Sequence, residues 1–209
     1  KLEAKEFDEN EETAAEHTYL LVKDSIERQL VSDVPLATFL SGGLDSSIIS
    51  KIASDIYNKS GKTLDTYSVD YTDNDKYFKK SLFQPNKDSD YIDVISSYIG
   101  SNHHNIVLNN VDVANALEEA AIERGVPGFV DIDSSLMLFC KEVKKDFTVC
   151  LSGECADEIF AGYPWYHKKE ILFENVFPWA RNTNIRQRIL KNGFLSDGEE
   201  YLQSAYKNT

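Results

Sequence analysis

The 209-residue sequence is poor in cysteine, in positive charge and in long apolar runs. Its three cysteines, Cys140, Cys150 and Cys155, form neither an even disulfide set nor a CxxC pair, so we expect a reducing, cytoplasmic location. Lys and Arg number 22 against 35 Asp and Glu, a net charge of −13, which argues against nucleic acid as a partner. No apolar run approaches the roughly 20 residues that span a bilayer, so no membrane partner is expected.

The rest of the composition is that of a globular domain, with 42% apolar residues. We expect a charged leader over residues 1–12, a core over 13–167 and a partial, truncated helical extension over 168–209, where the periodic patterns weaken. Because the chain begins at Lys1 and not at Met, we interpret it as a fragment of a longer protein.

Short buried strands alternate with helical patterns along the core. Apolar or β-branched runs predict strands at 36–40, 63–71, 103–108 and 147–151, and apolar spacing of three to four predicts helices at 14–32, 46–60, 89–99, 111–124 and from 133 onward. This alternation predicts an α/β fold, a twisted parallel sheet with helices on both faces.

The glycine turn 41-SGGLDSS-47 joins the first predicted strand to the next helix. Gly42 and Gly43 let the backbone approach phosphate oxygens, and the helix start directs free amides and its positive dipole end at them, with Ser41 and Ser46 as further donors. No Walker lysine is present, so Asp45 beside a triphosphate would need a Mg²⁺ ion to bridge it to the oxygens. The alternative is an ordinary strand-to-helix turn with a capped helix.

A second glycine turn, 152-SGECADEIFAGY-163, follows the fourth predicted strand. Open α/β sheets bind ligands at the carboxyl ends of their strands, so we expect the two turns to face one cleft. Glu154, Asp157 and Glu158 bring negative charge that an ATP site tolerates only where a metal and a proton-transfer role offset it. The alternative is a helix with acidic residues in its first turn.

LSGGLDSS after an apolar strand resembles the PP-loop of the ATP pyrophosphatases, which split ATP between the α and β phosphates. The pair of turns resembles asparagine synthetase, whose usual LSGEGADELFGGY differs here by Cys155 for Gly, Ile159 for Leu and Ala161 for Gly. The resemblance covers residues 13–167. It implies the PP-loop ATP pyrophosphatase fold and ATP-dependent synthesis of asparagine from aspartate and ammonia, through β-aspartyl-AMP, with release of AMP and pyrophosphate.

The resemblance also implies ATP and Mg²⁺ as cofactors and carries functional roles onto matching positions. The pyrophosphate loop would be Ser41, Gly42, Gly43, Asp45 and Ser46. The backbones that cradle adenosine would be those at Phe39, Val69, Ser152 and Gly153. Asp45 and Asp157 would be the metal ligands. Glu154 and Asp157 would be the catalytic residues. Glu154 would support formation of the acyl-adenylate and accept a proton from ammonia. An N-terminal glutaminase domain in the parent chain and a homodimer complete these expectations.

The sequence departs from the family in three places. Asp131, Ile132 and Asp133 stand where many relatives have an Arg before small hydroxyl residues, and that Arg would suit a substrate carboxylate. The downstream RxPFLD segment and a later Lys are not found, so the chain alone is expected to turn over poorly. A β-lactam synthetase-like acyl-adenylating ligase and a non-catalytic ATP-binding fragment therefore stay open, whereas the charge disfavours a tRNA-thiolating enzyme.

Overall fold

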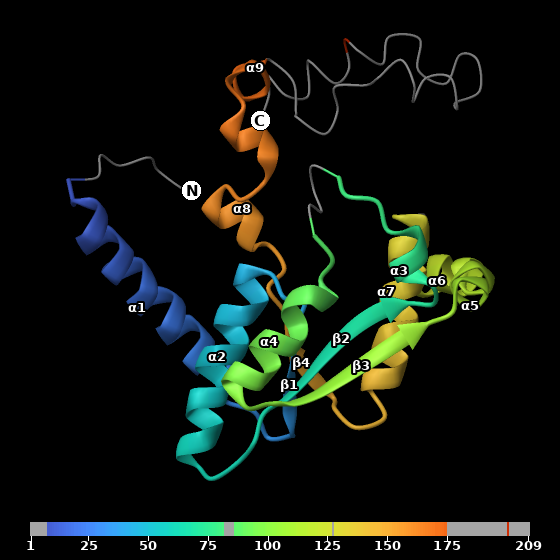
Figure 1. Cartoon of the computed structure of the whole chain (residues 1–209), viewed down its shortest axis with the longest axis horizontal. Coiled ribbons are helices and arrows are strands. Elements are labelled where there is room, and N and C mark those ends of the chain that lie inside the picture. Colours follow the sequence, from blue (N-terminus) through green and yellow to red (C-terminus); the bar gives the residue numbers. More distant parts are fainter. Residues whose placement is uncertain (1–7, 82–85, 127, 175–199, 201–209) are drawn as a thin grey trace. The chain divides into compact units, whose positions relative to one another are not determined.

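The computed structural model describes residues 8–81, 86–126, 128–174 and 200. The chain divides into two compact units, Lys1–Gly153 and Glu154–Thr209. The first unit holds α1 (Glu11–Gln29), β1 (Leu36–Phe39), α2 (Leu44–Lys59), β2 (Asp65–Tyr71), α3 (Asn74–Tyr77), α4 (Ser89–Ile99), β3 (Asn102–Leu108), α5 (Asn110–Asn115), α6 (Leu117–Arg124), α7 (Val130–Val143) and β4 (Val149–Leu151) (Figure 1). The described part of the second unit holds α8 (Ala156–Phe160), the 3₁₀ turn η1 (Pro164–His167) and α9 (Lys169–Leu172).

The four strands form one parallel sheet in the order β3-β2-β1-β4. Thr38 of β1 lies opposite Thr66 of β2 on one side and Leu151 of β4 on the other. The chain therefore steps from β1 to β2 to β3 in one direction and then returns to place β4 on the other side of β1. The predicted parallel α/β sheet is confirmed, and its strand order reverses between β1 and β4.

Helices cover both faces of this sheet, and successive side chains of β1 point to opposite faces and contact different helices. Ala37 belongs to a buried cluster with Tyr67 of β2 and Phe139 and Val143 of α7, on one face. On the other face, the hydroxyl of Thr38 bonds to that of Ser50 in α2 at 2.7 Å, with both residues fully buried. The sheet is thus held between α7 on one side and α2 on the other, as the sequence predicts.

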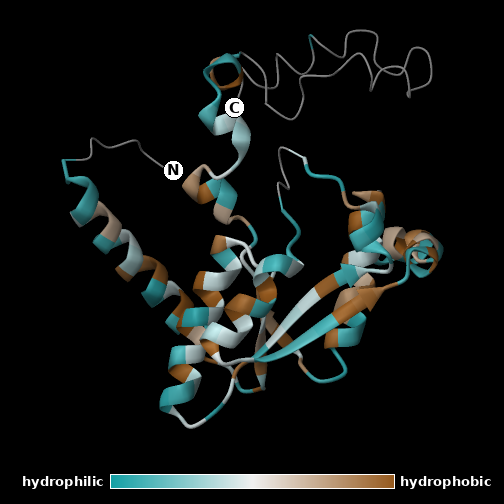
Figure 2. Ribbon diagram, in the orientation of Figure 1, coloured by the Kyte–Doolittle hydropathy of each residue, from teal (hydrophilic) through white to brown (hydrophobic). Residues whose placement is uncertain are grey.

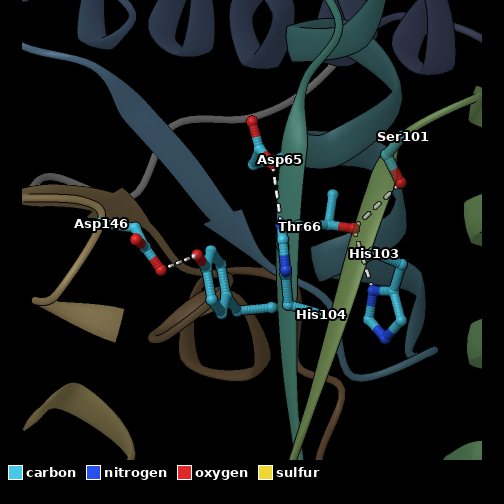
Figure 3. A network of polar contacts seen from close by, with 7 residues as sticks. Asp65, Thr66, Ser101, His103, His104 and Asp146 are labelled. Carbon is cyan, nitrogen blue, oxygen red and sulfur yellow. Dashed lines mark hydrogen bonds and ion pairs between the residues drawn. The ribbon is translucent and has the colours of Figure 1, made fainter. Parts of the chain in front are cut away.

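The strand β3 changes from hydrophilic at its start to hydrophobic at its arrowhead (Figure 2). In the polar half, His103 Nδ1 lies 3.0 Å from Thr66 Oγ1, which in turn lies 2.9 Å from Ser101 Oγ (Figure 3). His103 Nε2 lies 2.9 Å from Ser68 Oγ, which donates to Asn105 at 3.1 Å. Because Ser68 donates to Asn105, it accepts from Nε2, so the neutral imidazole carries its proton on that nitrogen.

Two predicted helices differ from the observed ones. The prediction of a single helix over 111–124 is wrong, because two helices, α5 and α6, meet at Ala116. The Ala116 amide donates to the Asp112 carbonyl at the end of α5, and the Ala116 carbonyl accepts from the Ala120 amide at 2.9 Å at the start of α6. The helix expected from Asp133 begins three residues earlier, at Val130. Both differences are local and leave the layers unchanged.

At the ends of the chain, the predicted leader is partly helical. Asn10 caps α1 by accepting from the Thr13 amide at 2.9 Å, and the helix begins at Glu11. The boundary predicted at 167 falls inside the second unit, which begins at Glu154, and much of the predicted extension lies outside the described residues. No helix in the described ranges has both the length and the apolar content to cross a membrane.

Candidate functional site

The turn after β1 is shaped by hydroxyl groups. Ser41 donates its amide to Ser46 Oγ at 3.1 Å, and Ser46 Oγ donates to the Gly43 carbonyl at 3.2 Å. Ser47 also donates to the Gly43 carbonyl, at 2.6 Å. Ser46 is only 6% exposed, so in this structure its hydroxyl holds the turn closed from inside. The exposed surface of the turn therefore consists of Gly43 and of the side chains of Ser41 and Leu44.

Gly42 is required in this turn for two reasons. Its φ is +78°, in the left-handed region that side chains rarely adopt. A β-carbon there would also stand 2.9 Å from the Asp88 carbonyl oxygen and 3.0 Å from Tyr91 Cβ, at the start of α4. The close approach of α4 thus fixes the turn from its outer side.

The start of α2 presents free backbone amides. Gly43 is the N-cap and supplies no side-chain cap bond, and the first intrahelical bond runs from the Ser47 amide to the Gly43 carbonyl. The amides of Leu44, Asp45 and Ser46 precede that bond and have no acceptor within the helix. Such an end attracts anions, and phosphate most of all.

The turn after β4 meets the turn after β1. Gly153 lies so close to α2 that a β-carbon on it would stand 2.9 Å from Asp45 Cβ and 3.1 Å from the Ser46 amide nitrogen. These two turns leave the carboxyl ends of β1 and β4, the neighbours between which the strand order reverses. Open α/β sheets bind their ligands at that point.

Two of the four residues predicted to cradle adenosine through their backbones, Phe39 and Val69, lie on the adjacent strands β1 and β2. The Phe39 ring packs against Phe139, with 4.8 Å between centroids, so its side chain belongs to the core. Val69 on β2 is 36% exposed. The Leu40 amide donates to the Tyr67 carbonyl at 2.8 Å and fixes the end of β1 against β2.

The acidic segment of the second turn belongs to the second unit, with Glu154 before α8 and Asp157 in it. The Tyr163 hydroxyl donates a hydrogen bond to Glu158 at 3.0 Å. This hydrogen bond is the main cause that raises the pKa of Tyr163 to about 12, and desolvation and the nearby carboxylates add to it. The Gly162 amide donates to the Asp157 carbonyl at 3.0 Å. The pairing of Asp157 with Asp45 at one metal ion stays a prediction.

Two residues of this segment have left-handed backbones, Cys155 with φ of 70° and Ala161 with φ of 54°. They occupy two of the four positions at which the usual asparagine synthetase turn quoted above has glycine. The conformation that glycine adopts freely is therefore retained here by residues that have a β-carbon.

Among the described residues, no group of three or more His, Cys, Asp or Glu side chains could hold a metal ion. Mg²⁺ at nucleotide sites takes one or two carboxylates and completes its shell with phosphate oxygens and water. Asp45, in the first turn of α2 beside the free amides, fits such a partial ligand set.

A cavity that sequence reasoning does not anticipate opens at the carboxyl ends of β2 and β3. Its volume is about 480 Å³, and its lining includes Tyr71, Asn110, Val130, Asp131 and Ser135. A second cavity, of about 790 Å³, lies at the amino ends of the strands, beside Leu36 and Asn102, and thus at the opposite edge from the glycine turns.

The sheet and the two turns define a parallel α/β protein with phosphate-binding geometry at its reversal point. The chain matches the asparagine synthase family model over residues 17–207, and it therefore belongs to that family. Asparagine synthetase (glutamine-hydrolyzing) 3 of Bacillus subtilis (strain 168) is 50% identical over 192 residues, which cover 90% of this chain and 31% of the relative.

A second relative, asparagine synthetase (glutamine-hydrolyzing) 1 of the same organism, is 31% identical over 147 residues, 70% of this chain and 21% of the relative. The chain thus spans about a third or less of the length of these curated relatives. Among solved structures, the NH3-dependent NAD synthetase of Campylobacter jejuni aligns with 96% of this chain and 85% of that one, at a TM-score of 0.39 and 10% identity.

Proposed function

We propose that this chain is the ATP-binding synthetase part of a glutamine-hydrolysing asparagine synthetase, with the PP-loop ATP pyrophosphatase fold. The observation that carries the proposal is the contact of Gly153 with Asp45 and Ser46, which joins the two glycine turns at the reversal point of the sheet. The names of the relatives support the choice of reaction.

In the proposed reaction, a side-chain carboxylate oxygen of aspartate attacks the α phosphorus of ATP, and pyrophosphate leaves. Ammonia then attacks the acyl carbon of β-aspartyl-AMP, AMP leaves with the C–O bonding electrons, and Glu154 accepts the proton that the nitrogen loses. The free amides of Leu44, Asp45 and Ser46 stabilise the charge on the departing pyrophosphate. Ser41, Gly42, Gly43 and Ser152 shape the turns that allow this approach.

Asp45 and Asp157 are the proposed Mg²⁺ ligands. The ion, when bound, neutralises phosphate charge that the acidic chain cannot offset by itself. The backbones at Phe39 and Val69 would hold adenosine at the ends of β1 and β2, since each lies at or near a strand end.

Three wider expectations belong to the same proposal. A glutaminase domain in the parent chain would supply ammonia, in keeping with the words "glutamine-hydrolyzing" in the names of the relatives. The enzyme would work in the cytoplasm, which fits three free cysteines. A homodimer remains part of the proposal.

Calorimetry of MgATP binding tests the nucleotide site. The parent chain should bind MgATP, and Asp45→Asn and Asp157→Asn should each weaken binding at least tenfold, because each removes charge from the metal while keeping side-chain size. Asp55→Asn is the matched control on α2, where Asp55 pairs with Lys51 at 2.5 Å, remote from the helix start. Equal loss in the control, or unchanged binding in Asp45→Asn, would refute the assignment.

A further inference from the structure

The cavity of about 790 Å³ lies at the amino ends of the strands. Its lining includes the first residues of three strands, Leu36 of β1, Asp65 of β2 and Asn102 of β3, together with Phe147 just before β4. Its volume falls in the range of about 300–1,000 Å³ that small-molecule pockets have. The glycine turns lie at the opposite edge of the sheet, so a ligand in this cavity would occupy a separate site.

Part of the lining is apolar and is only partly covered by the chain itself. Leu30, Ile56 and Phe147 are partly buried there. The Tyr57 hydroxyl donates to the Leu36 carbonyl at 3.1 Å, and this bond holds the tyrosine, near the end of α2, beside the start of β1. Partly exposed apolar and aromatic side chains gain free energy when an apolar group covers them. This part of the lining therefore fits a ligand with an apolar or aromatic body.

The lining also carries two charges of opposite sign that do not pair. Asp33, between α1 and β1, and Lys62, between α2 and β2, make no ion pair with each other or with any other residue in the described ranges. Hydrogen bonds fix both loops: the Val34 amide donates to Ser32 Oγ at 3.2 Å, and the Lys62 amide donates to the Tyr57 carbonyl at 3.0 Å. Opposite charges that line one cavity without pairing attract a ligand that carries both an ammonium and a carboxylate.

The third charged residue among the described part of the lining already has a partner. Asp65 Oδ1 lies 2.8 Å from His104 Nε2 (Figure 3). The His104 ring stacks on Tyr67 with 4.6 Å between centroids, which holds the imidazole in place beside the carboxylate. Asp33 is therefore the carboxylate of this lining that is left to meet the ammonium group of a ligand.

We propose that this cavity binds a zwitterionic aromatic amino acid, with Asp33 facing its ammonium group and Lys62 facing its carboxylate. The apolar part of the lining covers the ring of the ligand, and Tyr57 and Phe147 favour an aromatic ring because they can stack with it. A ligand with a single charge leaves one of the two protein charges without a partner, so both charges contribute to selection. The inference goes beyond the proposed function and does not depend on it.

The test is a titration of the isotope-labelled chain followed by amide NMR shifts, with three probes used separately. L-phenylalanine should shift the amides of Asp33 and Lys62 saturably. Phenethylamine, which lacks the carboxylate, and 3-phenylpropionate, which lacks the ammonium, should each bind at least tenfold more weakly. Either analogue binding as tightly as L-phenylalanine, or no saturable shift with L-phenylalanine, would overturn the proposal.

Variants locate the two selecting charges. Lys62→Gln should weaken L-phenylalanine binding at least tenfold and abolish the preference over phenethylamine. Asp33→Asn should weaken it to a similar extent and abolish the preference over 3-phenylpropionate. Lys59→Gln, an exposed lysine in the last turn of α2 outside the lining, is the matched control and should bind like the parent. Unchanged affinity in Asp33→Asn or Lys62→Gln, or an equal loss in Lys59→Gln, would overturn the assignment.

A competition experiment shows whether the site is separate from the nucleotide site. Saturating MgATP should leave L-phenylalanine bound, because the cavity and the glycine turns lie at opposite edges of the sheet. Competitive displacement of L-phenylalanine by MgATP would refute a separate site.

Discussion

Gly153 stands against Asp45 with no room for a side chain between them, since a β-carbon on the glycine would lie 2.9 Å from the β-carbon of the aspartate. The contact joins residues that are far apart in the sequence and close at the reversal point of the sheet. The absence of a side chain at position 153 is therefore a structural requirement of the candidate nucleotide site.

Gly153→Ala should destabilise the chain by about 1–3 kcal/mol, as overpacking of a close contact does. The opposing atoms belong to Asp45 and the backbone of Ser46, which have little freedom to move. Gly43→Ala is the control for stability, because its β-carbon would meet only Ser41 Oγ at an ordinary 3.4 Å. Urea unfolding measures both, and equal loss in the two variants would contradict the steric account.

Cys155→Gly and Ala161→Gly should each stabilise the second unit by about 0.5–1 kcal/mol. Glycine relieves the left-handed strain of about 1–2 kcal/mol, and part of this gain is offset by a more flexible unfolded chain. Ala156→Gly, inside α8, should instead destabilise, since glycine is a poor helix former. The rate of amide hydrogen exchange in α8 measures the change in stability in all three variants. Slower exchange in Ala156→Gly would contradict the prediction.

The buried hydroxyl pair of Thr38 and Ser50 should show strong coupling. Thr38→Val leaves the Ser50 hydroxyl without its 2.7 Å partner and should cost about 1–3 kcal/mol. Adding Ser50→Ala removes the stranded group, so the double variant should lose clearly less than the sum of the single losses. A double-mutant cycle of unfolding free energies measures this, and simple additivity would disprove the coupling.

Stability should fall as the pH drops below the unfolded pKa of histidine, about 6.5. Burial lowers the pKa of His103 in the folded chain, with Asp93 opposing the shift and His104 adding to it. The unfolded chain therefore binds more protons in the window between the two pKa values, so protonation favours unfolding there. His103→Asn should flatten this part of the curve. A curve unchanged in His103→Asn would rule this residue out as the cause.

The sheet could be predicted from the sequence because each strand is a short buried run that ends in a turn signal. The sequence also places the glycine turn between β1 and α2, because consecutive glycines between a strand and a helix are typical of a tight turn. The break at Ala116 escapes prediction because 111–124 has continuous helical spacing, and only packing around buried Val113 and Ala120 distinguishes the two helices.

Two features of the site depend on tertiary structure and leave no local signal. Val130 has φ of 37°, an unfavourable conformation for a β-branched residue, and nothing in its neighbours' propensities indicates it. Ser135 lies in an ordinary helical pattern, so its burial becomes visible only once α7 is packed beside β3. Both residues line the cavity of about 480 Å³, which explains why the sequence gives no warning of it.

The order β3-β2-β1-β4 also affects how the sheet forms during translation. The ribosome synthesises β1, β2 and β3 first, whereas β4 (Val149–Leu151), which pairs with the other side of β1, is synthesised later. Pairings between segments so far apart in the sequence form slowly, and they form after the local contacts. A nascent chain should gain protection from protease by MgATP only after Gly153 has left the exit tunnel. Until then the turn after β1 lacks the Gly153 turn beside it, so under the proposed function the order of synthesis sets the moment at which the nucleotide can first bind.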